Sequence, residues 1–153
     1  KHLLVAENGS YPLDLNDWET KVLRAEEKRE TFLGWYRNPD RGVHESLAIA
    51  YQTNGVWKAL RPDFIFLHEI NGEVVCDIVD PHGYHLADAL PKLRGLADYA
   101  ERHGEQYRRI EALAEVDGQL RVLDLKREHV RQAIKEETNA KHLYENELAS
   151  DYR

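Results

Sequence analysis

Residues 61 to 85 have the sequence RPDFIFLHEINGEVVCDIVDPHGYH. It contains two runs rich in aromatic and β-branched residues, which are typical of strands. Asn71 and Gly72 lie between the runs, at the spacing that a two-residue type I′ turn favours. With a loop of two residues, Ile70 pairs with Glu73. The stretch therefore predicts an antiparallel hairpin whose register follows from its turn.

The register decides which acidic side chains of the hairpin meet. Counting back from Ile70 and Glu73 places Asp63 opposite Asp80, and these two share a face of the sheet. Asp77 falls on the other face because side chains alternate along a strand, and burial there requires a basic partner. A three-residue loop with a bulge would reverse the assignment. The two-residue turn favours Asp63 with Asp80.

Paired carboxylates on neighbouring strands repel each other unless a cation, a proton or a basic side chain lies between them. Asp63 and Asp80 are thus a candidate site for Mg²⁺ or Mn²⁺, which oxygen ligands bind. Each acid also has an ordinary structural interpretation. Asp63 follows Pro62 at a strand start, and Asp80 begins a type I turn. Together, these two structural interpretations explain less well than a metal site does why Pro62 interrupts a strand.

The rest of the chain alternates between helical and strand-like patterns. Asn16 with Glu19 resembles a capping pair at the first helix, and Asn54-Gly55 and Asp117-Gly118 are further tight-turn signals. The predicted elements are a helix over 14–36, a three-stranded antiparallel meander over 46–53, 57–70 and 73–80, a helix over 85–103 that stops at Gly104, two strands around Asp117 and Gly118, and a charged helix over 126–149. This order, α-βββ-α-ββ-α, predicts an α+β fold with helices packed on a mixed β-sheet.

The composition is that of a single soluble domain. The chain has 153 residues, of which 42% are hydrophobic and 32% charged. No apolar run approaches the roughly 20 residues of a membrane span. The single cysteine, Cys76, excludes an internal disulfide and favours a cytoplasmic setting. A chain without methionine that begins at Lys1 is predicted to be a piece of a longer protein.

The net charge of -7 argues against a protein that coats nucleic acid through bulk charge. It is compatible with a metal-binding acidic site, because contacts to a phosphate backbone need only a local basic patch. Five basic residues fall within one short segment: Lys92, Arg94, Arg102, Arg108 and Arg109. A solvated helix face with ordinary salt bridges is the favoured interpretation of this segment.

The order of these features resembles the PD-(D/E)xK nuclease fold. The matching features are Pro62-Asp63, a short hairpin, an acid near the end of an apolar strand, a helix after it and a helix before the sheet. More narrowly, the block from about 45 to 150 resembles the C-terminal nuclease region of type III restriction enzyme restriction subunits and related helicase-linked nucleases. By this resemblance Asp63 and Asp80 match the two metal-binding acids.

The resemblance implies a restriction-endonuclease-like core over 1–153 that acts as a Mg²⁺-dependent DNA endonuclease. It also implies a C-terminal position in a larger polypeptide. The implied partners are DNA, a helicase or ATPase domain of the same polypeptide and a modification (methyltransferase) subunit, with no membrane. The chain contains no P-loop motif, so ATP would be used only by a motor domain elsewhere.

The sequence departs from that nuclease pattern at one position. The strand of these nucleases commonly ends in acid-x-Lys-Gly, where this sequence has Asp80-Pro81-His82-Gly83. His82 stands at the position of the lysine, and a neutral imidazole would accept a proton or bind a metal instead. Lys92 on the following helix is a candidate replacement for the missing cation, although a lysine that extends to solvent is the more ordinary interpretation.

Further acids are weaker candidates for the same site. This nuclease fold often carries an acid on its first helix, where Glu26 and Glu30 flank the apolar stripe. Asp77 would join the metal site if the hairpin slipped by one residue. The letters Asp124-Leu125-Lys126 form an intact acid-x-Lys motif, but Asp124 is better interpreted as the cap of the last helix. His85 is interpreted as a hydrogen-bonding residue near a turn rather than as a metal ligand.

Two other classes of function stay open. A catalytically inactive nuclease-like fold could bind DNA or dock other domains, and His82 in place of lysine supports that alternative. A small-molecule hydrolase is the weaker candidate, because the chain lacks both a nucleophile motif and a glycine-rich phosphate cradle.

Overall fold

The computed structural model describes residues 1–4 and 14–153, and its centre is a six-stranded sheet in the order β1-β4-β5-β6-β7-β8. The strands are β1 (Phe32–Arg37), β4 (Phe64–Ile70), β5 (Glu73–Pro81), β6 (Arg109–Val116), β7 (Gln119–Asp124) and β8 (Ser150–Asp151). β5 and β6 run parallel, and the other neighbouring pairs are antiparallel. The predicted α+β class with a mixed sheet is therefore confirmed.

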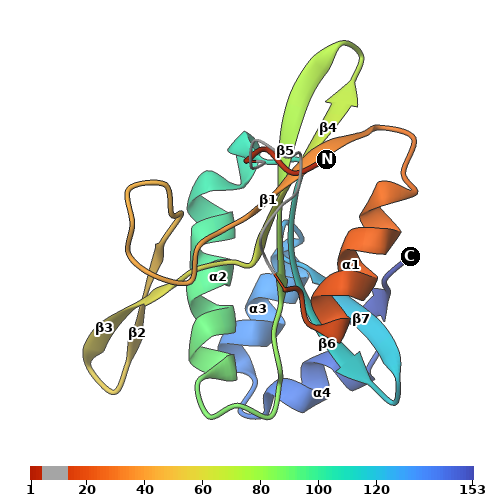
Figure 1. Ribbon diagram of the computed structural model, residues 1–153. Helices are drawn as coiled ribbons and strands as arrows, with labels where there is room; N and C mark the ends of the chain where they lie inside the picture. The colour runs from red at the N-terminus through yellow and green to blue at the C-terminus, as the bar shows by residue number, and fades with distance from the viewer. Residues whose placement is uncertain (5–13) are drawn as a thin grey trace.

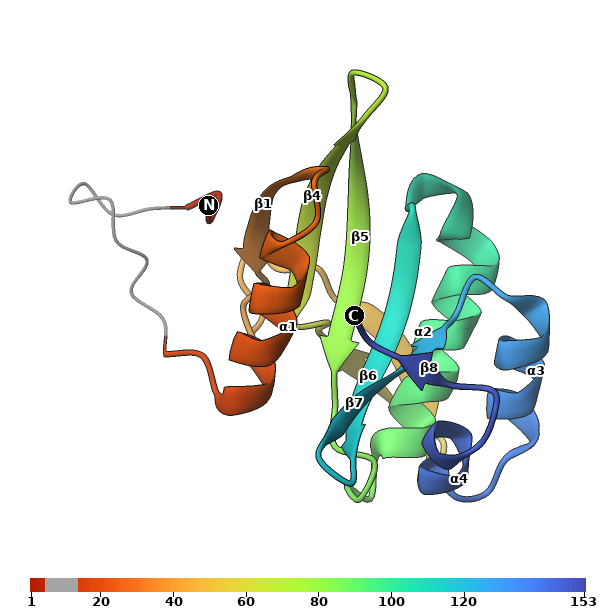
Figure 2. The ribbon, with the colours of Figure 1, turned by 90° about the vertical axis from the view of Figure 1, so that its right-hand side faces the viewer.

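Helices cover both faces of this sheet (Figures 1 and 2). On one face lies α1 (Asp17–Glu27), which begins with the predicted capping box between Asn16 and Glu19. On the other lie α2 (Ala89–His103), its extension η1 (Gly104–Gln106), α3 (Glu128–Glu136) and α4 (Ala140–Glu145). None of the described helices combines the length and the apolar character needed to cross a bilayer.

The alternation of side chains along β4 and β5 supplies the core on both faces. Phe64, Phe66 and Val79 are fully buried with Val22 of α1. Ile78 is fully buried on the opposite face, in the larger core that includes α2, α3 and α4. Successive side chains of β5 therefore pack into two different hydrophobic cores.

The three predicted tight turns are confirmed. Positive φ angles occur at both central residues in each: Asn54 and Gly55, Asn71 and Gly72, and Asp117 and Gly118. This is the geometry of type I′ turns. In the hairpin of β4 and β5, Ile70 pairs with Glu73 and Phe66 pairs with Asp77, as predicted from the turn.

The predicted helix over 14–36 is wrong in its second half. α1 ends at Glu27, and residues 32–37 form the strand β1 at the sheet edge. β1 gains main-chain pairing with β4, which outweighs a helical apolar pattern. Gly34 permits a further contact there, because a Cβ at this position would lie 2.7 Å from the carbonyl oxygen of Lys1.

The predicted three-stranded meander is also wrong. β2 (Ile49–Thr53) and β3 (Val56–Leu60) form a separate two-stranded sheet that projects beside α2 (Figure 1). The predicted strand over 57–70 is broken at residues 61–63, where Pro62 has no N–H group for a sheet ladder. The break redirects the chain from this small sheet into β4.

The C-terminal segment contains two short helices rather than the predicted helix over 126–149. Glu137, which follows α3, has an extended backbone and separates it from α4. Asp124 is not the helix cap, because the N-cap position of α3 is Arg127 and Asp124 instead accepts a hydrogen bond from the Lys126 N–H at 3.1 Å. Gly104 does end α2, in right-handed backbone geometry.

We expect Gly95→Ala to destabilise the protein, because a Cβ on Gly95 of α2 would collide with Cβ of Tyr51 on β2. Overpacking of this kind costs about 1–3 kcal/mol, more than the about 1 kcal/mol that alanine gains over glycine inside a helix. Gly104→Ala is the matched control, since a Cβ there has no described neighbour closer than 4.0 Å. Urea unfolding measures both variants. Equal or greater stability of Gly95→Ala would show that Tyr51 does not pack there.

Candidate functional site

One hollow of about 240 Å³ brings together the four residues that the sequence nominates as catalytic. Asp63, Asp80, His82 and Lys92 all line it. The remaining lining residues come from β3 and the loops beside it: Asp40, Ala59, Leu60 and Arg61. We call this hollow the Asp63–Asp80 pocket. Residues distant in sequence converge here because β5 ends where β4 and α2 begin.

The turn at Asn71-Gly72 positions the two acids of the pocket. Phe64 pairs with Val79, so the same register places Asp63 opposite Asp80. The main-chain N–H of Asp63 donates to Oδ1 of Asp80 at 3.0 Å. Asp80 is only 5% exposed. No described residue forms a hydrogen bond or an ion pair with its other carboxylate oxygen, which is left available to a ligand.

The two carboxyl groups are poorly compensated. Burial raises the pKa of Asp63 to about 7, and the nearby charge of Asp80 adds to this rise. Burial also raises the pKa of Asp80, although His82 and Lys92 oppose that effect. Arg37 donates to Asp63 at 2.9 Å and offsets the rise only in part. A buried acid, Asp80, and a half-buried acid, Asp63, thus lie together with raised pKa values, and a divalent cation between them would neutralise their repulsion.

His82 and Lys92 lie beside the two acids and differ in their own hydrogen bonds and ion pairs. Nε2 of His82 is buried without a hydrogen bond from the described residues, and it lies 3.9 Å from Oδ1 of Asp88. Burial lowers the pKa of His82, which favours the neutral ring. Nζ of Lys92 is 2.9 Å from Oδ2 of Asp88, so this cation is shared with an acid outside the pocket.

Four further residues lie in or beside this pocket without a sequence pattern that indicates them: Arg37, Asp40, Arg61 and Glu19. Arg37 links Asp63 to Glu19 of α1, with 2.5 Å between its guanidinium and the Glu19 carboxylate. Glu19 is thus the α1 acid that approaches the pocket. Arg37 was missed because the segment around it was predicted as helix, whereas it ends strand β1.

The structure does not bring Asp77 or Glu26 to the Asp63–Asp80 pocket. They lie on the opposite face of the sheet with His68, and the ligand atoms of the three are within 4.8 Å of one another. The Arg109 guanidinium donates to both, with its Nη2 2.7 Å from Glu26 and 2.6 Å from Asp77. All three members of this buried cluster have no exposed surface.

Guanidinium groups supply the positive charge that the buried cluster needs. Burial alone would raise the pKa of Asp77, but hydrogen bonds from Arg108 and Arg109 outweigh it and hold the pKa below its usual value. The pKa of Glu26 is lowered in the same way, chiefly by Arg109. The predicted basic partner of Asp77 is therefore confirmed, and this cluster is compensated without a metal ion.

The five basic residues of segment 92–109 do not form one nucleic-acid patch. Arg108 and Arg109 bind Asp77, whereas Lys92 lines the pocket on the other face. Arg94 donates to the main-chain oxygen of Glu137 at 2.7 Å, and Arg102 donates within α2. These contacts fit the favoured interpretation of ordinary structural pairing.

The weaker candidates also lie outside the Asp63–Asp80 pocket. Asp124 and Lys126 line two different hollows, so their acid-x-Lys letters do not converge. His85 is exposed and contacts the Tyr84 ring edge-on. Glu30 is an exposed turn residue after α1.

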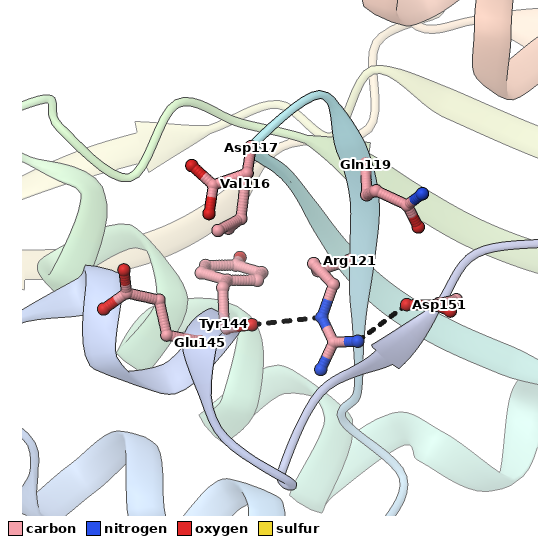
Figure 3. Close-up of a pocket in the computed structure, with 7 residues that line it drawn as sticks. All are labelled: Val116, Asp117, Gln119, Arg121, Tyr144, Glu145 and Asp151. Atoms are coloured by element: carbon pink, nitrogen blue, oxygen red, sulfur yellow. Dashed lines mark hydrogen bonds and ion pairs between the residues drawn. The ribbon is translucent and has the colours of Figure 1, made fainter.

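A hollow of about 380 Å³ between β7 and α4 has a structural explanation (Figure 3). Its central side chain, Arg121, donates to the Tyr144 carbonyl at 3.1 Å and to Asp151 at 2.7 Å. The same guanidinium donates to the carbonyls of Asn146 and Ala149. Arg121 therefore binds the C-terminal segment to the sheet through hydrogen bonds, and few of its N–H groups remain for a ligand.

We expect Asp77→Asn and Asp80→Asn to change stability in opposite directions in the absence of divalent ions. Asp77→Asn leaves Arg108 and Arg109 without their shared acid, which costs about 3 kcal/mol. Asp80→Asn keeps an acceptor for the Asp63 N–H and removes the repulsion between two buried acids, which gains on the order of 1 kcal/mol. Urea unfolding in EDTA compares them. Destabilisation by Asp80→Asn would mean that the pocket already compensates its acids.

Comparison with known proteins places the chain in a family. The model of the YagJ family matches residues 1–153. The chain is 56% identical over 152 residues to Protein YagJ of Escherichia coli (strain K12), a match that covers 99% of the chain and 63% of that protein. The chain therefore spans less than two-thirds of the length of this curated relative. No solved structure matches the chain. Because the family model covers every residue, the chain belongs to the YagJ family.

Proposed function

We propose that this chain is a metal-dependent nuclease domain in which Asp63 and Asp80 bind Mg²⁺ or Mn²⁺. One observation carries the proposal: the buried carboxyl group of Asp80 and the half-buried one of Asp63, both with raised pKa values, meet in a pocket that also contains His82 and Lys92. Structural acids are normally paired with basic groups, as Asp77 is on the other face. In the pocket, Asp80 has no basic partner among the described residues and Arg37 only partly offsets the raised pKa of Asp63. Acids with such perturbed pKa values in a pocket are typical of functional sites.

The arrangement of the chain supports a restriction-endonuclease-like core. α1 precedes an antiparallel unit of β1, β4 and β5, and α2 then connects β5 to the parallel strand β6. The two acids lie at the start of β4 and near the end of β5. These are the positions that the resemblance to PD-(D/E)xK nucleases implies.

The expected chemistry is hydrolysis of a phosphodiester bond in DNA. A bound divalent ion would stabilise charge on the phosphate and lower the pKa of a water molecule. Asp63 and Asp80 would hold it, and Arg37 would keep Asp63 oriented through its ion pair. Neutral His82 would accept a proton, and Lys92 would contribute positive charge beside the phosphate.

A catalytically inactive fold that binds DNA or docks other domains is the second candidate. Two observations favour it. His82 occupies the position where lysine is expected, and the nearest lysine, Lys92, is paired with Asp88. Both candidates agree with a larger polypeptide, in which we propose an ATP-dependent helicase domain and interaction with a methyltransferase subunit.

Plasmid nicking by the full-length protein, with ATP and with Mg²⁺ or Mn²⁺, tests the proposal. Asp63→Asn and Asp80→Asn should each reduce nicking more than about a hundredfold, because each removes a charge from a shared cation. Asp124→Asn is the matched control, since it changes an acid outside the pocket, and it should retain activity.

His82→Lys separates the two candidates. Nicking rises if histidine is a weakened substitute for lysine, and falls if the imidazole acts as a base or a ligand. Inactivity of both the wild type and a folded His82→Lys variant, with either ion, would reject catalysis in favour of docking.

A further inference from the structure

Arg61 lines the Asp63–Asp80 pocket as a cation with no ion-pair partner in the part of the chain that the structure describes. It lines the pocket together with three acids, yet no described carboxylate pairs with it. Its Nε is buried and lacks a hydrogen bond from any described residue. Gly42 lies behind the guanidinium, where a Cβ would come within 3.2 Å of Nη2. An unsatisfied buried donor is costly, and a movement of the Arg61 side chain toward an incoming acceptor would satisfy it.

The hairpin of β2 and β3 extends the pocket toward an exposed aromatic ring. Ala59 lines the pocket, and Trp57 lies on the same face of β3 because it is two residues away. Trp57 is 69% exposed. Ala50 pairs with Ala59, and both are exposed, so the surface between Trp57 and the pocket is formed by small side chains.

The opposite face of the hairpin has a structural role. Ile49, Tyr51 and Leu60 are buried there in the core that includes α2. Packing therefore explains that face but leaves Trp57 without a described function. Trp57 lies four residues before Arg61, whose guanidinium has no ion-pair partner among the described residues. An exposed aromatic ring and a guanidinium along one stretch of chain are the combination that binds single strands, because the ring stacks on a base and the charge binds a phosphate.

We propose that Arg61 and Trp57 form a track that guides single-stranded nucleic acid into the Asp63–Asp80 pocket. Arg61 binds a backbone phosphate with its guanidinium fork, and Trp57 stacks on an unpaired base. A base within a duplex does not offer its face to such a ring, so the track selects single-stranded segments over duplex. This inference rests on the proposed nuclease function, whose substrate class it narrows.

Fluorescence anisotropy with a labelled DNA oligonucleotide, single-stranded or annealed, tests the track in Ca²⁺. Trp57→Ala should weaken single-strand binding by roughly tenfold, and duplex binding by less than about twofold. Arg61→Gln should weaken single-strand binding by about tenfold and reduce the slope of log affinity against log salt by about 0.7. Circular dichroism and thermal melting establish that each variant is folded.

Two matched controls separate these contacts from general effects. Val56→Ala removes another exposed apolar side chain from β3, on the opposite face from Trp57. Arg24→Gln removes an exposed positive charge from α1. Both should leave single-strand binding within about twofold of wild type, because neither residue lies on the track.

The outcomes distinguish the track from the nuclease proposal. Metal-dependent nicking with single-strand binding unchanged by Trp57→Ala and Arg61→Gln would overturn the track and keep the nuclease. Binding that requires both residues, without cleavage in any ion, would support the track and reject catalysis. If Trp57→Ala abolished self-association in sedimentation while single-strand binding persisted, the surface would be a protein interface, which also overturns the track.

Discussion

The two-residue turn at Asn71 and Gly72 is the constraint on which the site depends. Side chains of a strand alternate with a period of two, so a slip of one residue would exchange the faces of Asp77 and Asp80. Both turn residues have positive φ, at 54° and 81°. The turn therefore fixes the pairing of β4 with β5. That pairing places one acid of β5 against arginines and the other in the Asp63–Asp80 pocket.

The two buried acids of strand β5, Asp77 and Asp80, have different surroundings. On the α1 face, Asp77 binds Arg108 and shares Arg109 with Glu26, and its pKa is lowered. On the α2 face, Asp63 and Asp80 lie together and their pKa values are raised. The first arrangement stabilises the fold at neutral pH, and the second costs stability unless a cation binds. This contrast within one strand is the physical basis for assigning function to the pocket.

Local chemistry made part of this structure predictable. The Asn-Gly and Asp-Gly turns could be predicted because two adjacent residues determine the backbone. The face of Asp77 and its basic partner followed from the Asn71-Gly72 turn. β1 and the separate β2–β3 sheet could not be predicted, because strand pairing with distant segments outweighed local patterns. Arg37 and Arg61 were missed for the same reason, since their roles depend on tertiary contacts with Asp63 and Gly42.

A crystal structure with Mn²⁺ is the most direct test of a divalent-metal site at Asp63 and Asp80. Anomalous scattering from Mn²⁺ locates the ion without reference to activity. We expect a peak between the carboxylates of Asp63 and Asp80 that is absent from an Asp80→Asn crystal. No peak at saturating Mn²⁺, or a peak only among Glu26, His68 and Asp77, would contradict it.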